Sequence, residues 1–224
     1  MFIDSKNVYS VSIIGCGDIG YKYDRGKSVQ GAFSHFRSFY TSPYFQIVGV
    51  SDINEEIINE INEKFNIPAY NDFRILIEKV PADVVVVATP DQTHATILKK
   101  IVYSYPRVVI CEKPLASGLN EVESLVQTYD LENVGLAVNY YRRYLNEYVE
   151  IGRQISSGEV GNVQSVVIYY SRGFIHNASH YIDLIFWWFG EPTDILVESI
   201  RKGLSADDPT LSVLLKYQRG LEVR

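Results

Sequence analysis

The chain has 224 residues, of which 46% are apolar, and carries a net charge of -6 at pH 7. This length is enough to bury one large or two small hydrophobic cores. The acidic balance excludes the basic stripe that nucleic-acid phosphates require. The first residues lack the pattern of a signal peptide and no apolar run reaches membrane-spanning length, so we expect a cytoplasmic protein without a membrane or nucleic-acid partner. Cys16 and Cys111, the only cysteines, are expected to be free thiols of a reducing compartment.

Strands and amphipathic helices alternate through the first 140 residues. The run "VVVV" at 84–87 is apolar without interruption, as is typical of a parallel strand buried on both faces. Helical stretches instead show one apolar face, for example Ile57, Ile58 and Ile61. This alternation predicts a parallel sheet with helices on both faces. The expected strands are 8–14, 45–52, 82–90, 107–115 and 134–140, and the expected helices are 53–65, 91–105 and 120–129.

The pattern changes near residue 140, which predicts a second domain at 141–224. A helix is expected at 146–156, and a second helix, rich in Ile, Phe and Trp, is expected to stop at Gly190. The remaining stretches have β character and indicate a largely antiparallel sheet. These expected strands are 162–171, 198–203 and 211–224.

A glycine turn follows the first strand, with Gly15, Gly17 and Gly20 in the spacing G-x-G-x-x-G. In this position Gly15 permits a tight turn, Gly17 lets a pyrophosphate approach the backbone, and Gly20 allows close packing of helix and strand. Asp18 and Ile19 complete the turn and are expected to contact the same cofactor. Phosphates are expected at the start of the following helix, where free N–H groups favour anions. The first domain is therefore predicted to be a dinucleotide-binding, doubly wound Rossmann domain over residues 1–140.

The second strand ends at Asp52, the place of the acid that binds a ribose 2′-hydroxyl in such domains. Ile53 and Asn54 follow it, so no arginine stands there to accept a 2′-phosphate. We therefore expect the cofactor to be NAD rather than NADP.

Polar residues follow two of the buried strands. Thr89, Pro90 and His94 come after one, and Glu112 and Lys113 come after the next. Ligands of open α/β sheets bind at the carboxyl ends of the strands, so these residues are candidates for contacting a ligand. A surface lysine is the ordinary alternative for Lys113, but its position at the end of an apolar strand favours a functional role.

With these motifs the chain resembles the glucose–fructose oxidoreductase / inositol dehydrogenase (Gfo/Idh/MocA) family. The resemblance implies a Rossmann domain followed by a domain with a large antiparallel sheet, and NAD(P)-dependent oxidation or reduction of a sugar, cyclitol or nucleotide sugar. It implies Lys113 and His180 as the catalytic pair, with Arg142 or Arg143 near the site. The matching segments are "GCGDIG", "VGVSD", "VVVVATPDQTHATIL", "CEKPLA", "AVNYYRRY", "SGEVGNVQSVVI" and "HNASHYIDL" with "WWFGEP".

The residue types suit hydride transfer, in which a proton leaves the substrate oxygen as a hydride leaves carbon. His180 can exchange that proton near neutral pH, and Lys113 can stabilise the developing negative charge or act as the base. Asp183, one helical turn after His180, is a candidate to orient the imidazole or line the substrate pocket. His176 occupies a position where many family members have aspartate; it is either a catalytic contact or a packed histidine.

Two other functions are consistent with parts of this sequence. A non-catalytic NAD-binding sensor would keep the first domain, although the retained Lys113 and His180 argue against it. A zinc hydrolase built on His176 and His180 lacks the glutamate of H-E-x-x-H and a third ligand, so we expect no metal.

Two further features depart from the family pattern. An insertion of about ten residues within "YKYDRGKSVQGAF", after Gly20, is either a cover for the cofactor cleft or a tolerated surface loop. The last residues, "LLKYQRGLEVR", end within the expected sheet of the second domain, which is therefore expected to be incomplete. Its exposed edge indicates either a fragment or a homo-oligomer formed through this sheet.

Overall fold

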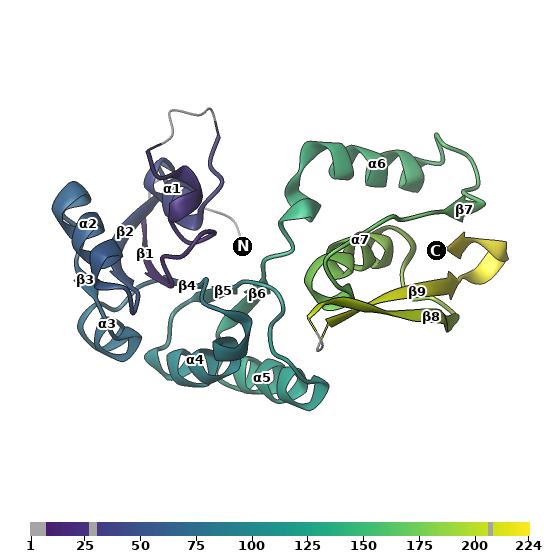
Figure 1. Cartoon of the computed structure of the whole chain (residues 1–224). Coiled ribbons are helices and arrows are strands. Elements are labelled where there is room, and N and C mark those ends of the chain that lie inside the picture. Colours follow the sequence, from purple (N-terminus) through teal and green to yellow (C-terminus); the bar gives the residue numbers. More distant parts are fainter. Residues whose placement is uncertain (1–7, 27–30, 206–207) are drawn as a thin grey trace. The chain divides into compact units, whose positions relative to one another are not determined.

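A computed structural model of the chain describes residues 8–26, 31–205 and 208–224 (Figure 1). The chain divides into two compact units, Met1–Asn139 and Tyr140–Arg224. Within the described residues, no helix is both long and apolar enough to span a membrane.

A six-stranded parallel sheet forms the centre of the first unit, with the order β3-β2-β1-β4-β5-β6. This is the strand order of the doubly wound dinucleotide-binding fold, so the predicted α/β fold class is confirmed. The strands are β1 (Tyr9–Ile14), β2 (Phe45–Ser51), β3 (Ala69–Tyr70), β4 (Val84–Val87), β5 (Val108–Cys111) and β6 (Gly135–Val138).

Helices cover both faces of this sheet (Figure 1). Alternate residues of β4 enter different cores: Val85 and Val87 pack in one, and Val84 and Val86 in the other. All four are buried, which explains why this strand is apolar throughout rather than at every second position. The helices are α1 (His35–Tyr40), α2 (Glu55–Phe65), α3 (Phe73–Lys79), α4 (His94–Ile101) and α5 (Leu119–Leu131), with 3₁₀ turns η1 (Lys22–Asp24), η2 (Asp91–Thr93) and η3 (Val102–Ser104).

The second unit has a four-stranded mixed sheet with the order β7-β10-β9-β8, mostly antiparallel as predicted. Ile185 of α7 packs on this sheet with Leu215 and Val223 in one apolar core. The elements are η4 (Tyr141–Tyr144), α6 (Asn146–Ser157), β7 (Ser165–Val166), the π-helical η5 (Phe174–Ala178), α7 (Ser179–Phe189), β8 (Asp194–Ser205), β9 (Asp208–Lys216), η6 (Gln218–Gly220) and β10 (Glu222–Val223).

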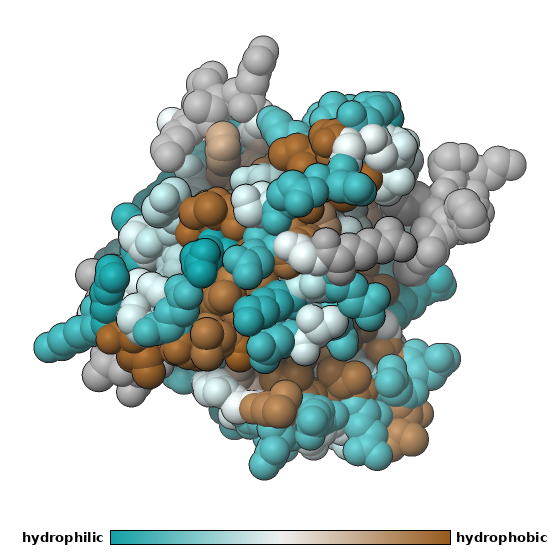
Figure 2. All heavy atoms as spheres, turned by 90° about the vertical axis from the view of Figure 1, so that its right-hand side faces the viewer, coloured by the Kyte–Doolittle hydropathy of each residue, from teal (hydrophilic) through white to brown (hydrophobic). Residues whose placement is uncertain are grey.

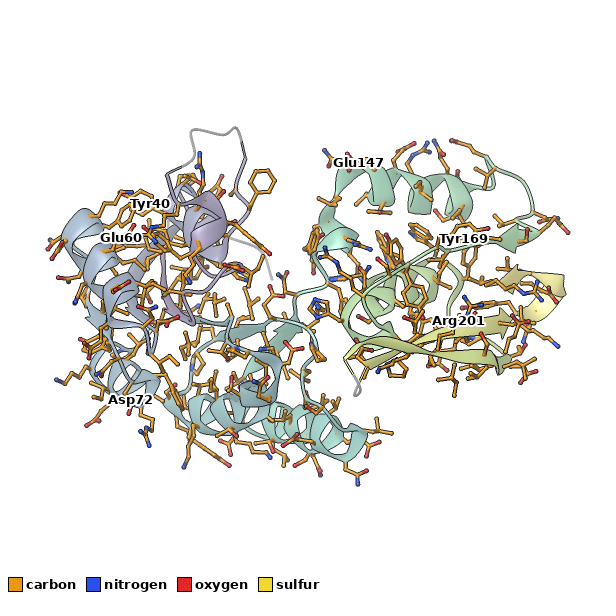
Figure 3. All side chains as sticks on the ribbon, in the orientation of Figure 1. Tyr40, Glu60, Asp72, Glu147, Tyr169 and Arg201 are labelled. Atoms are coloured by element: carbon orange, nitrogen blue, oxygen red, sulfur yellow. The ribbon has the colours of Figure 1, made fainter. Side chains whose placement is uncertain are left out.

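The strand expected at 162–171 is much shorter than predicted, since only Ser165–Val166 forms β7. A strand exists only where a neighbour offers paired backbone groups, and β7 pairs with the equally short β10. Beyond this pairing, the residues that follow β7 line an apolar groove of about 590 Å³ that also reaches α7, β8 and β9. Tyr169 and Arg201 lie on its lining (Figure 3).

Candidate active site

The glycine turn after β1 has the geometry that its spacing predicts. Gly15 has φ +92°, and a Cβ at this position would lie 2.6 Å from the Ala88 carbonyl carbon, so no other residue fits without a shift of the backbone. A Cβ on Gly20 would collide with the Gly15 carbonyl oxygen. Gly17 differs, because a Cβ there would meet nothing within 4 Å. The first and third glycines are thus required by the turn itself, whereas Gly17 leaves open space beside the backbone, as a bound pyrophosphate needs.

The helix expected directly after the glycines is interrupted by the inserted segment. One turn forms first, with the Tyr21 N–H donating to the Gly17 carbonyl. The hydrogen-bond ladder then resumes at α1, where His35 N–H donates to the Ile19 carbonyl at 2.9 Å and Phe36 N–H donates to the Gly20 carbonyl. Residues 27–30 of the inserted segment lie outside the described residues. On either side of them, the chain leaves the helical pattern after its first turn and resumes that pattern at His35.

A buried carboxylate anchors the end of the insertion. Asp24 Oδ2 accepts hydrogen bonds from Phe33 N–H at 2.9 Å, from Ser34 N–H at 2.7 Å and from the Ser34 hydroxyl at 2.7 Å. The Ser34 hydroxyl oxygen in turn accepts the Arg37 N–H and caps α1. Burial alone would raise the pKa of Asp24, but the hydrogen bonds from Ser34 and Phe33 lower it below its ordinary value.

Asp52 lies directly after β2 and contacts the glycine turn. Its Oδ2 accepts the Cys16 N–H at 2.6 Å and its Oδ1 accepts the Asn54 N–H at 2.8 Å. Each oxygen keeps a further lone pair, so the carboxylate can also accept ribose hydroxyls. Ile53 beside it is 92% exposed, and Asp18 is exposed as well.

The polar residues after β4 and β5 are brought together, as their positions predicted. His94 is completely buried; its Nε2 lies 2.8 Å from the Thr89 carbonyl oxygen and its Nδ1 lies 2.7 Å from the Pro114 carbonyl oxygen. The ring thus ties the segment after β4 to the segment after β5. Thr89 and Pro90 are more exposed and stay available to a ligand.

Glu112 is held at this edge of the sheet by two residues that the sequence analysis missed. Its Oε1 lies 2.8 Å from His35 Nε2 and accepts a hydrogen bond from Asn139 Nδ2 at 2.6 Å. Burial alone would raise the pKa of Glu112, yet the bonds from His35 and Asn139 and the charge of Lys113 lower it. Lys113 follows directly and is only 9% exposed. Lys113 is therefore not a solvated surface lysine, the ordinary alternative for this position.

His180 lies buried in the first turn of α7, between two tyrosine rings of the second unit. Its ring centroid is 5.7 Å from that of Tyr140 and 5.5 Å from that of Tyr141, both in edge-on arrangements. These edge-on ring contacts restrict the orientation of the imidazole. The tyrosines stand in the segment "AVNYYRRY", next to the two arginines that follow them.

Asp183 forms a two-pronged ion pair with Arg143. Its Oδ2 lies 2.7 Å from Arg143 Nε and its Oδ1 lies 2.7 Å from Nη2. This pairing joins α7 to η4 and directs the Asp183 carboxylate at the guanidinium. The sequence analysis gave Asp183 as a candidate to orient the imidazole or line the substrate pocket, and the ion pair adds a partner 40 residues away along the chain.

His176 and His180 differ in both setting and backbone. His176 belongs to the π-helical η5 and is exposed, whereas His180 belongs to α7 and is buried. Asp208 accepts the His176 N–H at 2.9 Å, so the backbone at this histidine is anchored although the side chain reaches the surface. Among the residues that the structure describes, no group of three or more His, Cys, Asp or Glu side chains is placed to hold a metal ion.

Comparison with known proteins agrees with this geometry. The sequence model of an oxidoreductase family with an NAD-binding Rossmann fold (GFO_IDH_MocA) matches residues 9–140. Inositol 2-dehydrogenase of Rubrobacter xylanophilus is 27% identical over 159 residues, covering 70% of this chain and 42% of that protein. An oxidoreductase of Formosa agariphila is 26% identical over 216 residues, covering 85% of this chain and 62% of that protein. The chain thus spans about half the length of these two relatives.

A solved structure shows the same fold over nearly the whole chain. The WlbA dehydrogenase of Bordetella pertussis, determined with NADH and UDP-GlcNAcA, superposes with a TM-score of 0.78 at 18% identity. The match covers 97% of this chain and 68% of that one.

Proposed function

Because the chain belongs to the oxidoreductase family with an NAD-binding Rossmann fold, we propose that it transfers a hydride between a nicotinamide cofactor and a hydroxyl-bearing carbon of a sugar, cyclitol or nucleotide sugar. One observation carries this proposal: Lys113, buried at the carboxyl end of β5, stands beside a carboxylate that His35 and Asn139 hold in place. The substrate class is supported by the relative named inositol 2-dehydrogenase and by the nucleotide sugar bound to the similar fold.

NAD is the proposed cofactor, in preference to NADP. The open space at Gly17 fits a pyrophosphate, and the Asp52 carboxylate suits the two hydroxyls of an unmodified ribose. A 2′-phosphate would face this negative charge, with the exposed Ile53 rather than an arginine beside it. We place Asp18, Ile19, Thr89, Pro90 and Glu112 in the same cofactor site, and propose that His94 acts on it through the Thr89 and Pro114 carbonyls.

When bound, the nicotinamide supplies the acceptor or donor of the hydride. The chain must then move one proton: as the substrate carbinol loses its hydride, its O–H proton passes to His180 or to Lys113, and a carbonyl group remains. Where His180 takes the proton, the protonated Lys113 stabilises the negative charge that develops on that oxygen, because a preorganised cation is effective there. Where Lys113 takes the proton, it begins as the neutral amine. The two tyrosine rings beside His180 hold its imidazole in one orientation for the transfer.

The two other candidates on the substrate side have more limited proposed roles. Asp183 sets the position of Arg143 and hence of η4, so we propose that it acts through the arginine. His176, exposed on η5, is proposed as a contact to substrate hydroxyls and not as the proton acceptor.

A screen of NAD and NADP against sugars, cyclitols and nucleotide sugars, followed by NADH absorbance, tests this function. On a substrate found this way, Lys113→Ala should lower kcat by about 100- to 10,000-fold, the range for loss of a proton-transfer or charge-stabilising group. Lys99→Ala is the matched control, because Lys99 is a half-exposed lysine of the same unit that pairs with Glu121. Full turnover by Lys113→Ala would refute the assignment.

We also propose that the chain forms a homo-oligomer through the sheet of the second unit. The edge strand β8 leaves Ile195, Leu196, Val197 and Ile200 between 48% and 71% exposed, and hydrophobic residues gather in patches on the face shown in Figure 2. Such an edge is normally covered by another strand or chain. Sedimentation should show an oligomer that Ile200→Glu dissociates; a monomeric wild-type chain would contradict this.

A cytoplasmic location is proposed from the state of the two cysteines. Cys16 and Cys111 are both free and buried, and burial raises the pKa of each thiol, so neither is a reactive group. Detection of the tagged protein in the cytoplasmic fraction of its host would support the location, and its recovery outside the cell would contradict it.

A further inference from the structure

Two neighbouring arginines of η4 differ in how their charges are balanced. Arg143 is neutralised by the two-pronged ion pair with Asp183. Arg142 has no carboxylate within ion-pair distance among the residues that the structure describes. Its Nη1 is buried and lacks a hydrogen-bond partner, although an N–H of a charged guanidinium is a strong donor. A buried donor left in this state is costly unless a ligand satisfies it.

Aromatic rings, and not acids, surround the Arg142 guanidinium. Its central carbon lies 4.3 Å from the centroid of the Tyr181 ring, and Tyr141 and Tyr148 are the other close neighbours. Burial alone would lower the pKa of Arg142, but a hydrogen bond with the Tyr141 side chain and the nearby phenols raise it, so the group stays charged. The rings hold the guanidinium in a fixed orientation while leaving its positive charge uncompensated.

This charge is connected to His180 through two tyrosines. Tyr181, on which the guanidinium stacks, directly follows His180 in α7, and Tyr141, which bonds to the guanidinium, places its ring 5.5 Å from the His180 ring. Arg142 therefore packs against two immediate neighbours of the proposed proton-exchanging residue, all within the second unit.

We propose that Arg142 binds an anionic group of the substrate, a carboxylate or a phosphate, and so makes an acidic sugar the preferred substrate of the site. The inference rests on the proposed function for its placement of the reacting carbon near His180. Arg142 is half-buried, and its guanidinium offers parallel N–H donors that match two oxygens of such a group. A neutral sugar would leave the positive charge without an anionic partner, which is a basis for discrimination between the two kinds of substrate.

The experiment compares matched pairs of acidic and neutral sugars on the full chain with NAD or NADH. The pairs are glucuronate with glucose, galacturonate with galactose, glucose 6-phosphate with glucose, and an inositol phosphate with myo-inositol. Both kcat/KM and calorimetric binding are measured for wild type, Arg142→Met and Arg142→Lys. Arg153→Met, which removes an exposed arginine of α6 paired with Glu150 and Glu159, is the control for loss of one positive charge.

We expect the acidic member of at least one pair to be preferred about 10- to 100-fold, the effect of one hydrogen bond to a charged group. Arg142→Met should abolish this preference with little change for the neutral member, Arg142→Lys should retain part of it, and Arg153→Met should retain all of it. Preference for a uronate over a sugar phosphate, or the reverse, identifies which anion is bound.

The inference is overturned, with the proposed function intact, if the neutral members are used as well as or better than the acidic ones. It is also overturned if Arg142→Met lowers kcat/KM equally for both members of a pair. If no sugar is turned over, the proposed function fails and calorimetry still decides about Arg142. Binding of an acidic sugar that Arg142→Met abolishes would then support the inference, and absence of any such binding would refute it.

Discussion

Replacement of Asp24 by alanine should destabilise the first unit more than removal of a single carboxylate usually does. The side chain is only 9% exposed, and one of its oxygens accepts three hydrogen bonds, two from backbone N–H groups and one from the Ser34 hydroxyl. Each hydrogen bond to a charged group contributes about 1.5–3 kcal/mol. Because the three share one acceptor and do not add, we expect the free energy of unfolding to fall by roughly 2–4 kcal/mol.

Urea unfolding followed by far-UV circular dichroism measures this loss, and hydrogen exchange localises it. The amides of Phe33 and Ser34 should lose protection first, since they donate directly to Asp24. Glu63→Ala, an exposed carboxylate of α2, is the control and should change stability by less than about 0.5 kcal/mol. If Asp24→Ala falls within that same small range, the carboxylate does not anchor the inserted segment and the reasoning is wrong.

Three further predictions concern the pH dependence of this anchor and the cofactor site. The pKa of Asp24 is lowered in the folded chain, so its contribution to the free energy of unfolding is complete above the pKa of the unfolded chain, about 3.9, and is lost as the pH falls further. The difference in stability between wild type and Asp24→Ala, measured by urea titrations, should therefore shrink in acid. Gly17→Ala should weaken NAD binding by about tenfold or more in calorimetry with little loss of stability. Gly15→Ala should lower both the affinity for NAD and the stability, because Gly15, unlike Gly17, has a positive φ and a blocked Cβ position. His35→Ala should lower kcat by about 10-fold or more with KM nearly unchanged, and His35→Gln should restore part of it, because the ring holds the Glu112 carboxylate in place.

Most of the first unit could be predicted from local sequence. Its strands β4 and β5 are continuous apolar runs and helix α2 carries one apolar stripe, so both patterns are visible within a few residues. The glycine turn was predictable for the same reason, because Gly15 and Gly20 are required by contacts within or next to the turn.

The contacts that complete the site could not be predicted, because they join distant parts of the chain. His35 and Glu112 are 77 positions apart, and Asp183 pairs with an arginine 40 positions before it. Helical spacing alone gave no sign that Arg143 is the ion-pair partner of Asp183. The same limit applies to β7, whose length depends on its pairing with β10 and not on its own β-rich composition.

Transfer of deuterium tests the central proposal most directly. A substrate found in the screen is prepared with deuterium on the reacting carbon and incubated with NAD and the full chain, and the NADH formed is analysed by mass spectrometry. We predict that the deuterium appears in the nicotinamide ring, and that Lys113→Ala loses this transfer while Lys99→Ala keeps it. NAD binding without any transfer of deuterium would contradict hydride transfer and indicate a cofactor-binding sensor instead.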